Sequence, residues 1–186
     1  MTNQEIEIAD TRSILSSLLA EACVELFSSY DVALTYQEQL TDSNEANFNL
    51  IALIGLGEEF FRASLTICAS PKLLKTSFPA SEKEISQVDI QDWLGELANQ
   101  LAGRIKNKVI RYGRKLDLGI PISIQGTHLR IDLPKSSIIS KHQFISEHKE
   151  LVELSLSTLI DDKFILTTPE ETNEEDILGE GEMLFF

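Results

Sequence analysis

Residues 89–113 place polar or small side chains at helical intervals of four, three and four residues, at Asp92, Glu96, Asn99 and Gly103. At ~100° per residue, these positions lie within about 40 to 60° of one another on one side of a helix. A carboxamide such as that of Asn99 can accept a hydrogen bond from a water molecule and orient it without needing a particular protonation state. The spacing therefore predicts a polar line that is either a solvated helix face or a chemical site.

The residue types on this segment favour a site. Gly95 and Gly103 each cost roughly 1 kcal/mol relative to alanine in a helix interior, and Asn99 costs somewhat less. Small residues on an outward face would let the backbone of another molecule come close. Three residues of low helix propensity with no evident structural benefit indicate a functional role.

Other elements must hold this line in place. The opposite side of the segment is apolar, and residues 10–29 also carry apolar residues at helical spacing, with Asp10 or Thr11 as the expected cap. Pro71 opens a short helix over 71–78, and Gly55 with Gly57 predicts a tight reversal. The predicted strands lie at 32–40, 49–57, 59–69, 118–126, 128–133, 142–160 (long enough for two strands) and 163–168.

The order of these elements suggests two related halves. A polar linker at 81–89 separates a helix with its strands from a second helix with its strands. Residues 18–26 and 93–101 match at three of nine positions, and one match aligns Glu21 with Glu96. Both an internal duplication and chance agreement between two amphipathic helices explain this similarity.

Composition and charge exclude several classes of function. The 186 residues are 42% hydrophobic and carry a formal net charge of −14, of which residues 161–186 contribute −8 through nine acidic residues and one lysine. One globular domain fits this profile, and its acidity argues against nucleic acid as the main partner. No apolar run approaches the ~20 residues of a membrane helix, and the polar start is no signal peptide. We therefore expect a cytoplasmic protein with no membrane partner.

The C-terminal residues 169–186 form an acidic segment that begins at Pro169. Its composition predicts a flexible tail. The last four residues, Met183 to Phe186, are either a docking peptide or disordered filler.

Cysteines and histidines show no spacing typical of a metal site. Cys23 and Cys68 lie in apolar segments without a CxxC motif, so we expect reduced core residues. His128, His142 and His148 are interpreted as surface histidines. We predict no metal site in this chain.

The end of the second predicted helix is strongly basic. It carries six cations and no acid: Arg104, Lys106, Lys108, Arg111, Arg114 and Lys115. Such cations complement the helix dipole. A docking surface for an acidic protein and a contact with nucleic acid are the alternatives.

The pattern Asp92-xxx-Glu96-xx-Asn99, followed by Pro121, resembles the signature of the CheC/CheX/FliY chemotaxis phosphatases. Between Asn99 and Pro121 lie 21 residues, one fewer than in the family signature. The stretches GLGEEFFRASLTI, PKLLKTSF and GIPISI also resemble a CheX-type domain. The resemblance covers about residues 10 to 160 and leaves the acidic tail outside, which predicts a single CheX-like domain over 1–168.

This resemblance implies an α+β fold in which two long helices pack on one face of a largely antiparallel sheet. It also implies a homodimer that hydrolyses the aspartyl phosphate of a CheY-like receiver domain. Asn99 would orient the attacking water and Glu96 would pair with the receiver's lysine, while the receiver would hold the required Mg²⁺. Contacts with the receiver are expected from Asp92, Gly95, Gly103 and Lys106.

Two other functions stay open. One is a non-catalytic module that binds a receiver domain or a flagellar-switch protein, and the weaker one is a scaffold whose partner engages the acidic tail. Asn99 favours the enzyme, because binding alone needs no water-orienting amide. In the first half, Val24 occupies the position of Asn99, so that half is expected to lack an active site.

Overall fold

The computed structural model describes residues 3–37, 49–79, 85–127, 129 and 138–167. Its helices are α1 (Asn3–Ser28), α2 (Pro71–Thr76) and α3 (Gln87–Ile110). Its strands are β1 (Leu34–Tyr36), β2 (Leu50–Glu58), β3 (Phe61–Ala69), β4 (Asp117–Leu118), β5 (Ile122–Gln125), β6 (Ile138–Ser146) and β7 (Leu151–Ile160). The predicted tail at 169–186 and, except for residue 129, the predicted strand at 128–133 lie outside the described residues.

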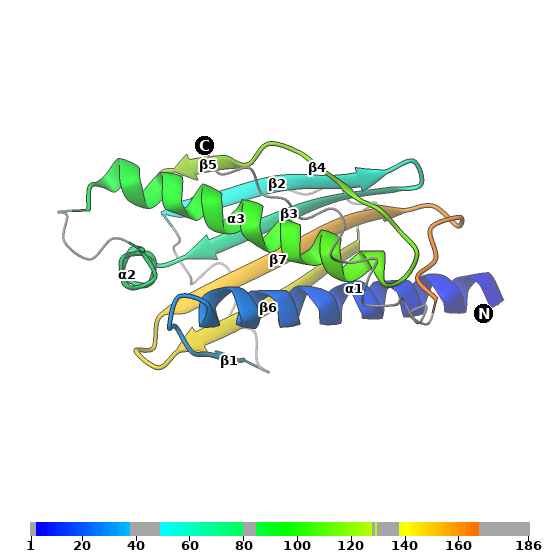
Figure 1. Cartoon of the computed structure of the whole chain (residues 1–186), viewed down its shortest axis with the longest axis horizontal. Helices are drawn as coiled ribbons and strands as arrows, with labels where there is room; N and C mark the ends of the chain where they lie inside the picture. Colours follow the sequence, from blue (N-terminus) through cyan, green and yellow to red (C-terminus); the bar gives the residue numbers. More distant parts are fainter. Residues whose placement is uncertain (1–2, 38–48, 80–84, 128, 130–137, 168–186) are drawn as a thin grey trace, which may run out of the picture.

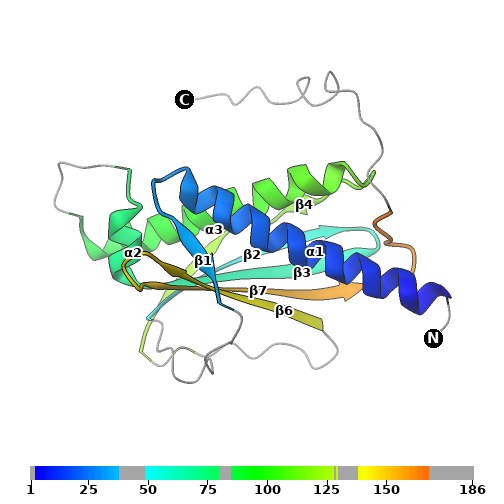
Figure 2. The ribbon, with the colours of Figure 1, turned by 90° about the horizontal axis from the view of Figure 1, so that it is seen from below.

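All seven strands belong to one antiparallel sheet, in the order β1-β6-β7-β3-β2-β4, with β5 also paired to β2. The long helices α1 and α3 lie side by side across the same face of this sheet (Figures 1 and 2). The α+β prediction, with two long helices on one face of an antiparallel sheet, is therefore confirmed. Among the described residues, none of the helices combines the length and the apolar composition that a membrane span requires.

The strand pairing also has the symmetry expected of two related halves. One half contributes α1, β1, β2 and β3, and the other contributes α3, β5, β6 and β7. Exchanging the halves turns the β1–β6 pair into β5–β2 and the β2–β3 pair into β6–β7, whereas the central β3–β7 pair maps onto itself. The halves therefore interlock, because each short first strand pairs with the opposite half.

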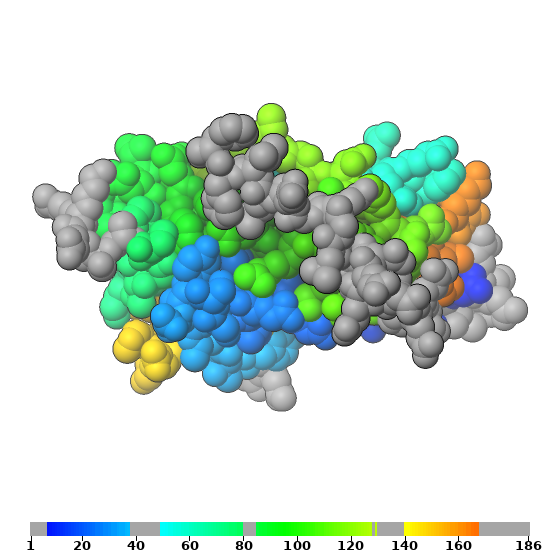
Figure 3. Space-filling view, viewed as in Figure 1, coloured from blue at the N-terminus to red at the C-terminus, as the bar shows by residue number. Residues whose placement is uncertain are grey.

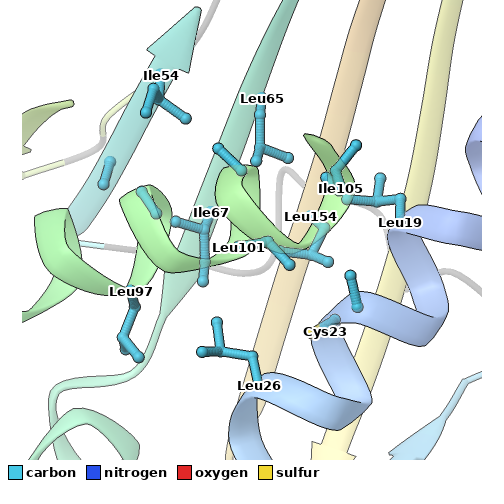
Figure 4. Close-up of a cluster of buried hydrophobic side chains, with 14 of the residues drawn as sticks. Leu19, Cys23, Leu26, Ile54, Leu65, Ile67, Leu97, Leu101, Ile105 and Leu154 are labelled. Atoms are coloured by element: carbon cyan, nitrogen blue, oxygen red, sulfur yellow. The ribbon is translucent and has the colours of Figure 1, made fainter. Parts of the chain in front are cut away.

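A continuous apolar core lies between the helices and the sheet (Figure 4). Helix α1 contributes Leu19 and Leu26, helix α3 contributes Leu97 and Leu101, and all four are fully buried. Residues on β2, β3 and β7 meet them from the sheet side, among them Ile54, Leu65, Ile67 and Leu154. This burial of apolar area is the main force that fixes both helices on the sheet.

Helix α1 is longer than predicted. It begins at Asn3, so Asp10 and Thr11 lie inside the helix and do not cap it. Thr11 is fully buried, and its hydroxyl oxygen accepts a hydrogen bond from the backbone N–H of Leu166 at 3.0 Å. Thr11, which was expected to cap the helix, therefore joins two segments that are distant in the sequence.

The predicted strand at 163–168 is wrong for its described part, residues 163–167, which carry no strand pairing. Phe164 and Leu166 are buried there, and the Phe164 ring stacks on Phe61 with centroids 4.4 Å apart. The apolar alternation therefore reflects packing into the core. It mimics a strand because alternate side chains of an extended segment also point the same way.

The predicted tight reversal between β2 and β3 is present, but Gly55 and Gly57 do not form it. Strand β2 continues through both glycines to Glu58, and the chain reverses just before β3 begins at Phe61. Gly119 crosses close to this strand, and its N–H donates to the Gly55 carbonyl at 2.8 Å. A Cβ on Gly119 would lie 3.4 Å from the Gly55 carbonyl oxygen, so the small size of residue 119 lets the two backbone segments come close.

Candidate active site

Helix α3 is fixed at its start by a capping box. The Ser86 hydroxyl accepts the Asp89 N–H at 3.2 Å, and the Asp89 carboxylate accepts the Ser86 N–H at 2.9 Å. Both bonds satisfy backbone donors that the first turn would otherwise leave unpaired. The cap places the start at Gln87, within the predicted linker, and the buried apolar side then sets the rotation of the helix.

The opposite side of α3 presents the predicted polar line. Asp92, Glu96 and Asn99 are exposed, and Gly103 is half-buried with open space where a Cβ would stand. Neighbours three or four residues apart on a helix have Cβ atoms about 5–6 Å apart, so the Glu96 and Asn99 side chains share one patch. In the space-filling view, α3 and α1 form adjoining parts of the surface (Figure 3).

Glu96 is held by a short chain of hydrogen bonds. The Gln100 amide donates from Nε2 to Glu96 Oε1 at 3.0 Å, and its Oε1 accepts from the Tyr30 hydroxyl at 2.8 Å. Neither Gln100 nor Tyr30 belongs to the polar line predicted from the sequence. The four-residue spacing of Glu96 and Gln100 was an available signal, whereas nothing in the sequence near Tyr30 connects it with α3.

Gly95 does not lie on the outward face where it was expected. It is buried, and a Cβ built on it would stand 2.7 Å from the Ser123 hydroxyl oxygen on β5. The small size of residue 95 therefore lets α3 approach the sheet edge. The structural gain from glycine at this position is helix–strand packing.

The basic end of α3 is used in large part to hold neighbouring elements. Lys108 Nζ lies 2.8 Å from Glu25 and 3.3 Å from Glu21 on α1, and the hydrogen bond to Glu25 is the main cause that raises the pKa of Lys108. Arg104 donates to the Ser29 hydroxyl at 3.3 Å, and Arg114 lies 3.5 Å from Glu58. Lys106 is half-buried and lies in the turn next to Gly103.

The two cysteines are free and buried, as predicted. Burial raises the pKa of both thiols, that of Cys68 to about 12 with a further contribution from the Glu153 carboxylate. Neither thiol is therefore poised as a nucleophile.

His142 is not a surface residue. It is buried on β6, where Nε2 lies 2.9 Å from the Ser16 hydroxyl oxygen, whereas His148 is exposed and His128 lies outside the described residues. Within the described residues, no group of three or more His, Cys, Asp or Glu could hold a metal ion.

The polar line on α3 combines a carboxylate with a carboxamide on a rigid helix. Among the described residues, no side chain or backbone group hydrogen-bonds the Asn99 amide, which leaves it able to bind water. Helix α3 lies on one face of the sheet (Figures 1 and 2), and Glu96 and Asn99 are exposed on it, so another macromolecule can bring a reacting group to them.

The family model described as "Chemotaxis phosphatase CheX" matches residues 50–145, just over half of the chain. No curated protein sequence matches the chain. Solved structures with the same fold include a CheC-like superfamily protein from Shewanella sp. PV-4, with a TM-score of 0.66 and 18% identity, which covers 78% of this chain and 97% of its own.

Two further structures share the fold. Chemotaxis protein CheX from Vibrio vulnificus has a TM-score of 0.65 at 16% identity and covers 76% of this chain and 97% of its own. The CheX–CheY–BeF3–Mg²⁺ complex from Borrelia burgdorferi has a TM-score of 0.57 at 11% identity, with 80% and 97% covered. The family match spans both Glu96 and Asn99, and the chain belongs to the CheX family of chemotaxis phosphatases.

Proposed function

We propose that this protein hydrolyses the aspartyl phosphate of a CheY-like receiver domain. The observation that carries the proposal is the exposure of Glu96 and Asn99 in one patch of α3, in a chain of the CheX family. A phosphorylated receiver is a large substrate that can place its phosphate against an open helix face. The similar structure from Borrelia burgdorferi, a CheX–CheY complex, supports a receiver as the partner.

The reaction requires no covalent catalysis by the protein. An aspartyl phosphate is an activated acyl phosphate, so catalysis rests on placing a water in line and stabilising charge. The water oxygen bonds to phosphorus as the bond to the aspartate oxygen breaks. The products are the free carboxylate, which keeps the bonding electrons, and inorganic phosphate, and a water proton is released.

In this proposal Asn99 accepts a hydrogen bond from the attacking water and holds it in line with the phosphorus. Glu96 pairs with the receiver's active-site lysine and fixes the two proteins in register. The required Mg²⁺ would be held by the receiver, where it would supply charge neutralisation at the phosphoryl group. This chain supplies the amide and the carboxylate and needs no metal of its own.

The surface around this pair completes the proposed docking site. Asp92 lies one turn before Glu96, and Gly103 leaves open space one turn after Asn99 where receiver backbone can approach. Lys106 adds a positive charge beside this space. Gly95 is left out of the docking site because it packs against Ser123. The proposal also retains a homodimer and a cytoplasmic location.

The test follows the decay of a phosphorylated CheY-like receiver from the same organism in the presence of Mg²⁺. Wild-type protein should accelerate the decay, and Asn99→Ala should lose on the order of 10²-fold or more in rate, as for other lost transition-state contacts. Asn107→Ala is the matched control, because it makes the same change at an exposed position two turns further along α3.

The possible outcomes distinguish the phosphatase from the non-catalytic binding module. Equal acceleration by wild type and Asn99→Ala would keep the phosphatase and reject the role of Asn99. Binding of the receiver without acceleration would support the non-catalytic module. If neither binding nor acceleration occurs with any receiver of the organism, the proposed function is rejected.

A further inference from the structure

We infer that Gln100 and Tyr30 are positioning residues that hold the Glu96 carboxylate ready for the receiver's cation. This inference rests on the proposed function, because it assigns a purpose to the side chains behind Glu96. Neither residue belongs to the Asp-xxx-Glu-xx-Asn pattern. Both are placed by the tertiary structure.

Gln100 acts as a bridge with one fixed orientation. Its amide donates to Glu96 at 3.0 Å and accepts from Tyr30 at 2.8 Å, and only the NH₂ end of the amide can pair with the carboxylate. If the amide were turned over, its oxygen would face the carboxylate oxygen and its NH₂ group would face the phenol. The Glu96 carboxylate, which can only accept, therefore sets the orientation in which Gln100 donates to it, and the Tyr30 hydroxyl donates to the amide oxygen and restrains Gln100 in that position.

Tyr30 is held by the core. Its ring meets Trp93 edge-on, with centroids 4.9 Å apart and planes at 89°. Trp93 is only 7% exposed, and its indole N–H donates to the Ser77 hydroxyl at 3.0 Å. Ser77 in turn donates to the Leu74 carbonyl at the end of α2. The bridge is thus anchored in packed side chains and extends out to an exposed carboxylate.

The hydrogen-bond donor to Glu96 is a neutral amide, and this distinguishes Glu96 from Glu21. In the first half of the fold, Glu21, which aligns with Glu96, lies 3.3 Å from Lys108, and that cation is available to neutralise it. Among the described residues Glu96 forms no ion pair, and its partner is a neutral amide. An amide restrains the carboxylate without cancelling its charge, so the full attraction for a partner's ammonium group remains.

The expected benefit lies in binding. A free glutamate side chain must lose rotamer freedom when it docks, and a restrained one has already lost part of it. A single hydrogen bond is worth a few-fold in an equilibrium constant, so we expect Tyr30→Phe and Gln100→Leu each to weaken receiver binding by about 3- to 10-fold. KM should rise by a similar factor, while kcat should change by less than about 2-fold.

The decisive experiment is a double-mutant cycle with Glu96→Ala. The probe is a receiver domain bound to beryllofluoride and Mg²⁺. This ligand is not hydrolysed, so the dissociation constant of the complex between the receiver and this protein can be measured. If Tyr30 and Gln100 act through Glu96, their variants should cause no further loss once Glu96 is alanine. Equal losses in both backgrounds would overturn the positioning role and leave only a structural one. Tyr36→Phe is the matched control, because this tyrosine contacts His142 and Phe144 on another part of the sheet.

A second readout keeps this inference separate from the proposed function. The side-chain amide resonance of Gln100 should shift in Tyr30→Phe and in Glu96→Ala, and an unchanged resonance in both would overturn the bridge. If wild-type protein binds the receiver but does not hydrolyse its phosphate, the proposed function fails. The binding cycle would still support or overturn the positioning of Glu96.

Discussion

The Thr11 hydroxyl oxygen on α1 lies 3.0 Å from the backbone nitrogen of Leu166, a residue 155 positions later in the chain. Thr11 is fully buried and Leu166 is 3% exposed, so this hydrogen bond is shielded from water. It attaches the segment after β7 to the helix that begins the fold. A buried backbone N–H left without a partner is costly, which makes this bond a test of how the last described segment is held.

Thr11→Val should lower the free energy of unfolding by about 1–3 kcal/mol, because it keeps the shape and leaves the Leu166 N–H unpaired. Thr11→Ser keeps the hydrogen bond and should cost only about 1 kcal/mol for the lost methyl group. Urea denaturation of both variants measures the difference. Equal stabilities for the two variants would show that the hydrogen bond adds nothing.

Gly95→Ala tests the packing of α3 against β5. The new Cβ would meet the Ser123 hydroxyl oxygen at 2.7 Å, so we expect an overpacking cost of about 1 kcal/mol or more. In a Ser123→Ala background the same change should stabilise the protein, because alanine is the better helix former by roughly 1 kcal/mol. Gly103→Ala is the control, since nothing lies within 4 Å of its Cβ position. Additive effects of the Gly95 and Ser123 changes would contradict the contact.

Glu21→Ala should leave receiver hydrolysis nearly unchanged. Glu21 is paired with Lys108, and Val24 stands where the second half has Asn99, so α1 offers no amide to orient water. The side chain is 59% exposed, and its loss should cost only about 0.2–1 kcal/mol of stability. Phosphate release is compared with that of Asn99→Ala, and similar losses in both variants would reject the assignment of the active half.

His142 should make the fold sensitive to acid. Burial lowers the pKa of His142 below its ordinary value of 6.5, whereas the contact with Ser16 acts in the opposite direction. The unfolded chain therefore binds this proton more readily than the folded one, and stability should fall as the pH drops below about 6.5. His142→Gln should lose less stability than wild type between pH 7 and pH 5, as measured by urea denaturation. An unchanged pH dependence would show that His142 contributes nothing to it.

Helix α3 and the polar line along it follow from the local residue pattern. Its period of apolar residues required one buried side, and the spacing of Asp92, Glu96 and Asn99 then placed all three on the other side. The same local rules located β2, β3 and most of β6 and β7, because strands and helices leave different periods in the sequence. The spacing of Asp92, Glu96 and Asn99 also matches the family signature, which does not depend on any tertiary contact.

The roles of the remaining residues depend on contacts between segments that are distant in the sequence. Gly95 is a packing residue because β5 passes beside it, and residues 163–167 bury Phe164 and Leu166 in the core without any strand pairing. Tyr30 and Gln100 are 70 positions apart, and their hydrogen bond exists because α1 and α3 lie side by side. Local periodicity reports which side of an element is buried, but a contact between distant segments depends on how the whole chain packs.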